Sequence, residues 1–287
     1  MLIDVLQLFY YALVYGAVMA LGAIGVSLIF GILRFANFSH GDLMTVGAYI
    51  TFGFVTWFGW PIWLALIPAV IITAVICVII DRLFYRRLRR TAPVILLISS
   101  FGAGLILRAL VQLIFGPGNQ VYRSGISIPF RVQGVVITPN SLWVLFGASV
   151  MVVLVHLFLT RTRMGKSMRA MSDNVDLALV SGIPAERVIM WTWVAGGTLA
   201  AVGGILLGMN TQLHPTMGYR MLLPIFAAAI VGGIGRPYGA ILGAFIISLA
   251  MQYSTLVISP AYMPAVAFAI MLVVLIFRPQ GLFKGTL

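Results

Sequence analysis

Apolar stretches long enough to cross a lipid bilayer dominate the sequence, and short polar breaks separate them. A membrane-spanning helix needs roughly 20 apolar residues. Only helices and closed barrels satisfy every backbone group inside a bilayer, and these stretches are too long and continuous for barrel strands. Of the 287 residues, 62% are hydrophobic and 8% are charged, against roughly 25% charged in soluble domains. We therefore expect an all-α, polytopic membrane protein.

The apolar pattern predicts eight or nine transmembrane helices in a single transmembrane domain covering residues 1–287. The eight clear spans are expected at about 5–33, 43–58, 62–80, 93–115, 142–159, 188–209, 238–258 and 263–277. The ninth segment, 221–235, is short for a span and ends in a glycine-rich run. It either crosses fully or is re-entrant.

Charge between the spans indicates how the chain is oriented. Eighteen Lys and Arg against six Asp and Glu leave a net charge of +12, and the cations cluster in the breaks. Cytoplasmic loops carry the excess of Lys and Arg, so the runs 82–90, 161–169 and 278–284 are expected inside. Counting back places the N-terminus outside and the C-terminus in the cytoplasm. Such clustering indicates contact with the lipid bilayer and excludes nucleic acid as a partner.

The longest connection between expected spans, residues 116–140, is predicted to lie outside. It holds several Gly and Pro residues, and Ile126, Ile128 and Phe130 alternate with other residues in a period of two. Alternation of this kind is typical of a strand. The segment is therefore either a short hairpin or an interfacial stretch.

A polar interruption at 161–187 is the most organised break in the chain and is predicted to be a cytoplasmic coupling segment. Apolar residues recur there every three or four positions, which is the helical period. Gly182 suits the left-handed residue that ends a helix, and Pro184 suits the start of the next one. Asp173, with Ser167 and Ser172, is a candidate cap. The coupling candidates are Met168, Met171, Asp173, Val175, Ala178, Leu179, Gly182 and Pro184. On spacing alone this helix either lies on lipid headgroups or docks in a groove of a soluble partner.

A second polar cluster lies beside an apolar span. Asn37, Ser39, His40 and Asp42 can line a transport pathway as an unwound element, or cap the two helix ends that meet there. Arg108 and Gln112 lie one turn apart inside a span. Because a charged side chain is costly in lipid, Arg108 is expected to face protein or water, where it binds a substrate carboxylate or has a structural role. These six residues are the pathway candidates.

Small residues recur every four positions along two expected helices. The rows are Gly196, Ala200, Gly204 and Gly208 in one helix, and Gly235, Gly239 and Gly243 in another. In lipid, helices associate through close backbone approach, which such rows permit. They are either tight packing seams or seams that slide during transport.

The sequence holds no motif for catalysis or for metal binding. Walker A, H-E-x-x-H and G-x-S-x-G sequences are absent, as is any Cys/His cluster of metal-binding spacing, and the single cysteine, Cys77, lies in an apolar span. We therefore expect no catalytic residue, no metal ligand and no cofactor in this chain. Ion-driven carriers bury more ionisable groups than these six scattered acids, so a separate source of energy is favoured.

Four segments carry a family resemblance. Residues 169–188 resemble the coupling region of the branched-chain amino acid (Liv-type) ABC transporter permeases, and residues 37–49 resemble the N-F-A-H-G-[ED] signature of that family, with Ser39 in place of Ala. Residues 226–243 are similar to its glycine-rich late segment, and 278–283 to its R-P-Q-G-L-[FV] end. The four occur in the family's order, and the length resembles the shorter permease subunit.

The resemblance implies a bacterial inner-membrane permease subunit of an ABC importer for branched-chain or other hydrophobic amino acids. Its implied partners are a second homologous permease in a heterodimer, two ATP-binding subunits on the cytoplasmic face and an extracytoplasmic substrate-binding protein. ATP hydrolysis would belong to those partners, so the chain itself is not expected to be an enzyme. Two alternatives remain: a urea or short-amide ABC permease of the same architecture, and an ion-coupled secondary carrier that works alone.

Overall fold

The computed structural model describes residues 2–89, 91–122, 129–283 and 285. Arg90, Ile126, Ile128 and Lys284, which entered the arguments on charge and on the hairpin, lie outside the described residues. The helices of the described chain are α1 Leu2–Leu33, α2 His40–Trp57, α3 Ile62–Ile80, the π-helical turn η1 Asp81–Tyr85, α4 Arg86–Leu88, α5 Pro93–Phe115, α6 Pro139–Arg161, α7 Arg163–Asp173, α8 Val175–Val180, α9 Ala185–Asn210, α10 Met217–Gly232, α11 Pro237–Ser254, the 3₁₀ turn η2 Pro260–Tyr262 and α12 Met263–Phe277.

A two-stranded hairpin is the one sheet within the described residues. Strand β1, Phe130–Val132, pairs antiparallel with β2, Val135–Ile137. The turn between them contains Gln133 and Gly134, both with positive φ, as the type I′ turn of two-residue hairpins requires. The connection between α5 and α6 therefore includes a short hairpin, which was one of the two alternatives that the alternating pattern left open.

Mostly helical structure with several membrane-spanning helices is confirmed, but the number eight or nine is not. Six helical segments in the described chain are long and apolar enough to cross a membrane, or up to seven if the bent pair α10 and α11 counts as one span. That pair bends by 119° at a short break, where the sequence pattern indicated a short or re-entrant segment. Helix α2 is not among the six, and its 18 residues include His40, Asp42 and three threonines.

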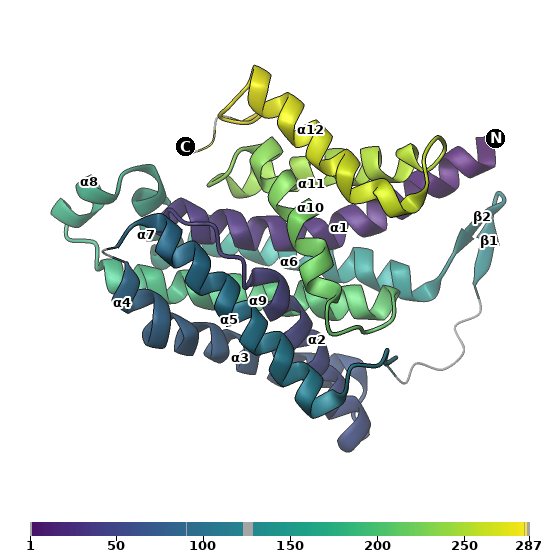
Figure 1. Ribbon diagram of the computed structural model, residues 1–287, viewed down its shortest axis with the longest axis horizontal. Helices are drawn as coiled ribbons and strands as arrows, with labels where there is room; N and C mark the ends of the chain where they lie inside the picture. The colour runs from purple at the N-terminus through teal and green to yellow at the C-terminus, as the bar shows by residue number, and fades with distance from the viewer. Residues whose placement is uncertain (1, 90, 123–128, 284, 286–287) are drawn as a thin grey trace.

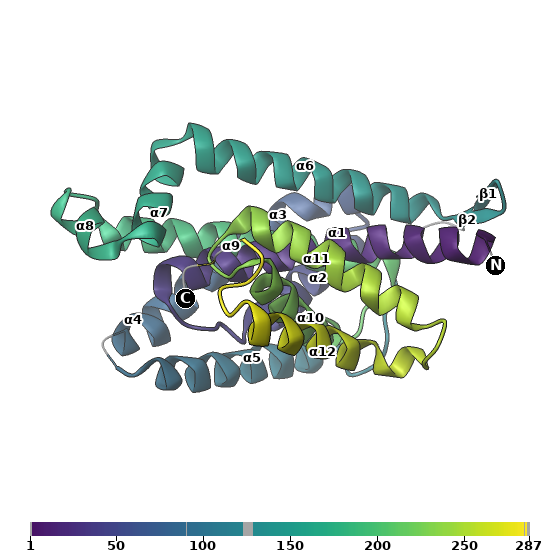
Figure 2. The ribbon, with the colours of Figure 1, turned by 90° about the horizontal axis from the view of Figure 1, so that it is seen from above.

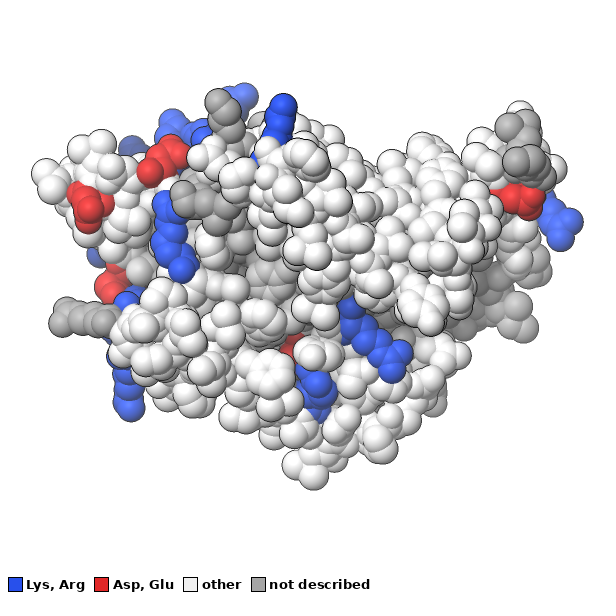
Figure 3. Space-filling model, turned by 45° about the horizontal axis from the view of Figure 1, so that its top comes forward, with Lys and Arg blue, Asp and Glu red and all other residues white. Residues whose placement is uncertain are grey.

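The long helices run along the long axis of the molecule, so the connections gather at its two ends (Figures 1 and 2). One end, here called the hairpin end, holds the N-terminus and the β1–β2 hairpin. The opposite end, here called the handle end, holds α4, α7 and α8. Most of the charged side chains visible in Figure 3 lie toward the handle end, and a largely white surface separates the two ends. The segments that the charge pattern assigned to one side of the membrane thus share one end of the fold.

Helices α1 and α9 form the centre of the bundle. In their most apolar windows 89% and 72% of the residues are buried, against 22% for α6 and 6% for α12. Helix α11 lies against α1, and the Ser248 hydroxyl donates a 2.7 Å hydrogen bond to the Ala12 carbonyl. The peripheral helices α3, α5, α6 and α12 expose mainly Leu, Ile, Val and Phe, as surfaces in contact with lipid or another membrane subunit do.

The small-residue rows lie at the closest helix contacts. A Cβ added at Gly204 of α9 would overlap the Met44 carbonyl of α2, and one at Gly243 of α11 would overlap the Ala228 carbonyl of α10. In the first row Gly196, Ala200 and Gly208 are also buried, as is Gly239 in the second. Gly235 does not belong to the second row, because it lies in the turn before α11 with φ +86°. Whether either row slides stays a prediction.

Candidate functional site

Helix α2 begins inside the bundle. Arg34, at the end of α1, donates a 3.0 Å hydrogen bond to the Ser172 carbonyl of α7, which fixes this point at the handle end. The chain then returns along α1, and the ring of His40 occupies the space that a side chain at Gly25 would need. Gly25 lies eight residues before the end of α1, roughly 12 Å back along the helix. Residues 34–39 are therefore non-helical backbone at the depth of the bundle.

Side chains of the protein bind two backbone amides of this non-helical segment, as backbone at membrane depth needs partners from the protein. The Asn37 Oδ1 accepts hydrogen bonds from the Ser39 hydroxyl at 2.7 Å and from the Ser39 amide at 3.2 Å, and the Tyr85 hydroxyl lies 3.1 Å from that of Ser39. The Ser100 hydroxyl of α5 accepts from the Phe38 amide at 3.0 Å. Asn37, Ser39 and His40 are at most 1% exposed, so in this conformation they support the segment from within the core.

Asp42 and Arg108 form an ion pair between α2 and α5. The Arg108 Nε donates to Asp42 Oδ1 at 3.0 Å, and its Nη2 donates to Oδ2 at 3.2 Å. The face of the guanidinium lies 4.2 Å from the centre of the Tyr219 ring in α10. Asp42 is 2% exposed, and the Arg108 side chain is 16% exposed. Three helices thus meet at one charged pair, and Gln112 is exposed one turn further along α5.

Helix α10 begins beside the start of α2. The Gly218 amide donates a 3.1 Å hydrogen bond to the Thr45 hydroxyl, and Gly218 packs directly on the Gly41 carbonyl. The Asp42 carboxylate lies in the first turn of α2, where the partial positive charge of a helix N-terminus stabilises an anion. A polar junction inside an apolar bundle results, in the manner of interrupted transporter helices.

At the handle end, the coupling segment folds into two short helices and not one. Thr162 caps α7 by accepting from the Gly165 amide at 2.9 Å, and Asn174 caps α8 by accepting from the Leu177 amide at 2.9 Å. Asp173 is therefore the last residue of α7 and caps neither helix. The sequence pattern did not identify Thr162 or Asn174, because several neighbouring polar residues qualify equally as caps.

Beyond α8 the chain turns as expected. Gly182 has φ +79° and follows the helix, and Pro184 is the residue before the first turn of α9. The apolar stripe divides into two groups. Met168, Met171 and Ala178 are buried in the protein, and Val175 is half-buried. Leu179 is 47% exposed and its neighbour Val180 is 88% exposed, which leaves an apolar tip on an otherwise polar end.

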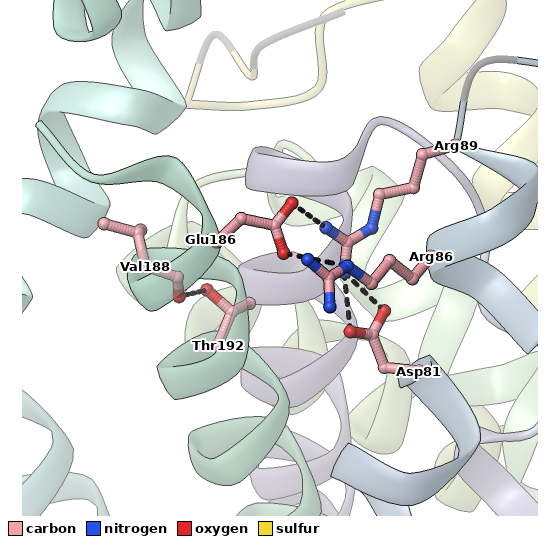
Figure 4. Close-up of polar contacts among 6 residues, drawn as sticks. All are labelled: Asp81, Arg86, Arg89, Glu186, Val188 and Thr192. Atoms are coloured by element: carbon pink, nitrogen blue, oxygen red, sulfur yellow. Dashed lines mark hydrogen bonds and ion pairs between the residues drawn. The ribbon is translucent and has the colours of Figure 1, made fainter. Parts of the chain in front are cut away.

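An ion network ties the start of α9 to the turn after α3, and Figure 4 shows the four charged side chains pointing toward one another. The Arg89 Nη2 donates to Asp81 Oδ1 at 2.7 Å, and its Nη1 donates to Glu186 Oε1 at 3.0 Å. Arg86 Nε lies 3.4 Å from Glu186 Oε2. Because Glu186 lies near the end of the coupling segment, in the first turn of α9, this network connects that segment to η1 and α4.

No group of three or more His, Cys, Asp or Glu side chains that could hold a metal ion occurs within the described ranges. Tyr85 and Tyr219, which complete the two polar clusters, were not identified from the sequence. A tyrosine in a basic run and another at a helix start carry no distinguishing local pattern. The pairing of Asp42 with Arg108 was also not predicted, since the residues are 66 positions apart.

These features define a class: a polytopic helical membrane protein with a polar junction inside its bundle and an exposed helical handle at one end. Solved structures support this fold. PsaBC from Streptococcus pneumoniae covers 94% of this chain with a TM-score of 0.50 at 16% identity. A structure described as a metal-chelate type ABC transporter in an inward-facing conformation covers 95% with a TM-score of 0.51 at 15% identity. At these identities the likeness concerns the fold alone.

Sequence relatives identify the family. The family model for the branched-chain amino acid transport system permease component matches residues 8–275, so the chain belongs to this family. The permease protein BraD of Pseudomonas aeruginosa is 31% identical, with 96% of this chain and 95% of the relative covered. LivH of Escherichia coli K12 is 29% identical over 96% and 94% of the two chains. LivH of Methanocaldococcus jannaschii, described as a probable branched-chain amino acid permease, is 28% identical over 94% and 90%.

Membership confirms the resemblance that the four motifs indicated. The chain is a permease component of an ABC transport system and not an enzyme. An ion-coupled carrier that works alone is therefore excluded as its class.

Proposed function

We propose that this chain is the membrane permease subunit of an ABC importer that translocates branched-chain or other hydrophobic amino acids, and that it needs no cofactor of its own. The observation that carries the proposal is the similarity to BraD along nearly the whole length of both chains. The apolar bundle with one charged junction suits a neutral zwitterion that has an aliphatic side chain.

The proposed assembly contains a second, homologous permease, two ATP-binding subunits and a substrate-binding protein. The exposed apolar tip of α8 is the proposed contact with an ATP-binding subunit, because an amphipathic helix end that leaves apolar side chains uncovered is typical of docking into a groove. The exposed apolar side chains of the peripheral helices α5 and α12 are the proposed contact surface for the second permease. The binding protein would dock at the hairpin end, opposite the ATP-binding subunits.

The proposed mechanism follows from the connections in the chain. Closure of the ATP-binding subunits would move α7 and α8, and the Glu186 network would carry the movement to α3 and α9. Helix α9 contacts α2 closely at Gly204, and α11 contacts α10 closely at Gly243. At these contacts the helices would then shift relative to one another around the junction at Asp42. In this scheme Asp42, Arg108 and Gln112 line the pathway, and Asn37, Ser39 and His40 support it.

We also propose that the handle end is cytoplasmic and the hairpin end is outside, in a bacterial inner membrane. The clustered cations at the handle end favour this orientation. With the N-terminus outside and the C-terminus inside, the number of passages must be odd, so α10 would be the short ninth passage, since its 16 residues give a length of roughly 24 Å.

Uptake by the reconstituted transporter tests the proposal. The chain would be co-expressed with the permease, ATPase and binding-protein genes adjacent to its own, and placed in proteoliposomes. ATP-dependent accumulation of labelled leucine that unlabelled isoleucine or valine suppresses, and urea does not, is the expected result. Accumulation of urea without leucine would contradict the proposed substrate.

A further inference from the structure

Arg108 has hydrogen-bonding capacity that the protein leaves unused. A guanidinium carries five N–H donors. Among the described residues only Asp42 accepts from Arg108, through Nε and Nη2. The Tyr219 ring covers one face of the guanidinium, and the side chain remains 16% exposed. The Nη1 edge is therefore available to another acceptor.

The surroundings of Arg108 indicate water or a polar ligand and not lipid. Gln112, one turn along α5, and Arg220, next to Tyr219 in α10, are exposed, whereas the other exposed positions of α5 are apolar. Polar side chains at membrane depth face a water-filled cavity or a protein partner. Arg108 thus has one exposed polar residue a turn away on α5 and a second beside its contact residue Tyr219 on α10.

The chemistry of this edge selects an anion with two oxygens. A planar guanidinium binds a carboxylate through two parallel N–H···O bonds, which fixes the ligand in orientation as well as in position. Asp42 neutralises the charge of Arg108, so the pair attracts a carboxylate more weakly than a lone arginine would. A pathway needs this balance, because a site that holds its cargo too tightly does not release it.

We infer that Arg108 binds the carboxylate of the amino acid as it crosses the membrane domain, and that Asp42 and Tyr219 are positioning residues that hold the guanidinium for it. The inference rests on the proposed function, since it requires an amino acid as cargo. It assigns to the membrane subunit a selection step of its own, directed at the group that all α-amino acids share.

The test compares charge removal with structural replacement in the full reconstituted transporter. Arg108→Gln is expected to lower the turnover of leucine uptake at saturating binding protein at least about tenfold, because a charge-assisted hydrogen bond is lost. Arg108→Lys keeps the positive charge but lacks the two parallel N–H donors of the guanidinium, and it should retain part of the turnover. The concentration of loaded binding protein that gives half-maximal uptake should not change in either variant. Arg87→Gln, an exposed arginine at the handle end, is the matched control and should behave as the wild type.

The double variant Asp42→Asn with Arg108→Gln separates carboxylate binding from structural support. It removes both charges together, so neither residue is left as an uncompensated buried charge, and neutral replacements of buried pairs are often tolerated by the fold. We expect normal assembly, retained ATPase stimulation by loaded binding protein, and uptake as low as in Arg108→Gln. Restored uptake in the double variant, or failure of both variants to assemble, would assign the pair to the fold and overturn the inference.

Two failures are distinguishable in the same preparation. If the wild type accumulates leucine and Arg108→Gln keeps its turnover, the inference alone is wrong and the proposed substrate stands. If the wild type accumulates urea and no amino acid, the proposed substrate is wrong and the inference falls with it.

Discussion

At the scale of single residues, burial decides which charged contacts matter. Asp81 and Glu186 both accept from Arg89, yet the Asp81 side chain is 7% exposed and that of Glu186 is 62% exposed. An exposed ion pair is screened by water and contributes about 0–1 kcal/mol. A buried group that loses a charged partner retains a desolvation penalty that nothing offsets. The Asp81–Arg89 contact in Figure 4 is therefore expected to contribute more to the free energy of unfolding than the Glu186–Arg89 contact.

Asp81→Asn is expected to lower the free energy of unfolding by about 1.5–3 kcal/mol, because Arg89 loses a charged acceptor in a partly buried site. Glu186→Gln should lower it by about 1 kcal/mol or less. Thermal unfolding of the purified subunit in detergent measures both changes. Equal decreases in the free energy of unfolding for the two variants would show that burial does not determine how much each contact contributes.

At the scale of elements, the described coupling segment separates residues that hold the handle from residues that face outward. Met168, Met171 and Ala178 fix α7 and α8 to the bundle, so their loss would act on folding. Leu179 and Val180 contact little of this chain. Leu179 and Val180 are exposed next to side chains that are buried in the protein. Such an arrangement suits a contact with a partner that moves α7 and α8 as one unit.

Val180→Asp is expected to reduce co-purification of the ATP-binding subunits with the permease at least about tenfold, because a charge enters an apolar contact. Val257→Asp is the matched control: Val257 is 89% exposed and lies between α11 and α12, near the hairpin end. It should leave co-purification unchanged. Retained co-purification of Val180→Asp would remove α8 from the docking surface.

At the scale of the whole molecule, segments that lie at the same end of the fold must lie on the same side of the membrane. The N-terminus and the hairpin occupy one end, and α4, α7 and α8 occupy the other (Figure 1). An orientation that holds for one of these segments therefore holds for its neighbours. By the positive-inside rule, several runs of cations together support the proposal that the handle end is cytoplasmic.

Labelling of engineered cysteines tests this orientation, since Cys77 is the single native cysteine and is buried. In a Cys77→Ser background, Asp4→Cys should react with a membrane-impermeant maleimide in intact spheroplasts. Asp176→Cys in α8 should react only after the membrane is permeabilised, because a charged reagent does not cross the bilayer. The reverse pattern would invert the proposed topology.

Much of the architecture could be predicted from the sequence, because the relevant signals are local. Hydropathy located most of the helices, the cations marked the handle end, and a single glycine marked the turn at Gly182. The family followed from four short segments in order. Each of these signals depends on residues that are close together in the chain, where helical period and backbone preference act directly.

The tertiary structure alone decided what the distant parts of the chain do to one another. It paired Asp42 with Arg108 and Tyr219, brought Tyr85 onto Ser39, and began α2 inside the bundle. It also removed Gly235 from a helix row and divided the coupling stripe into a buried and an exposed part. Contacts of this kind depend on which helix faces approach one another, and no local period encodes that choice. The sequence by itself determined a helical ABC permease, and the packing of its helices determined which charged and polar side chains meet inside the bundle.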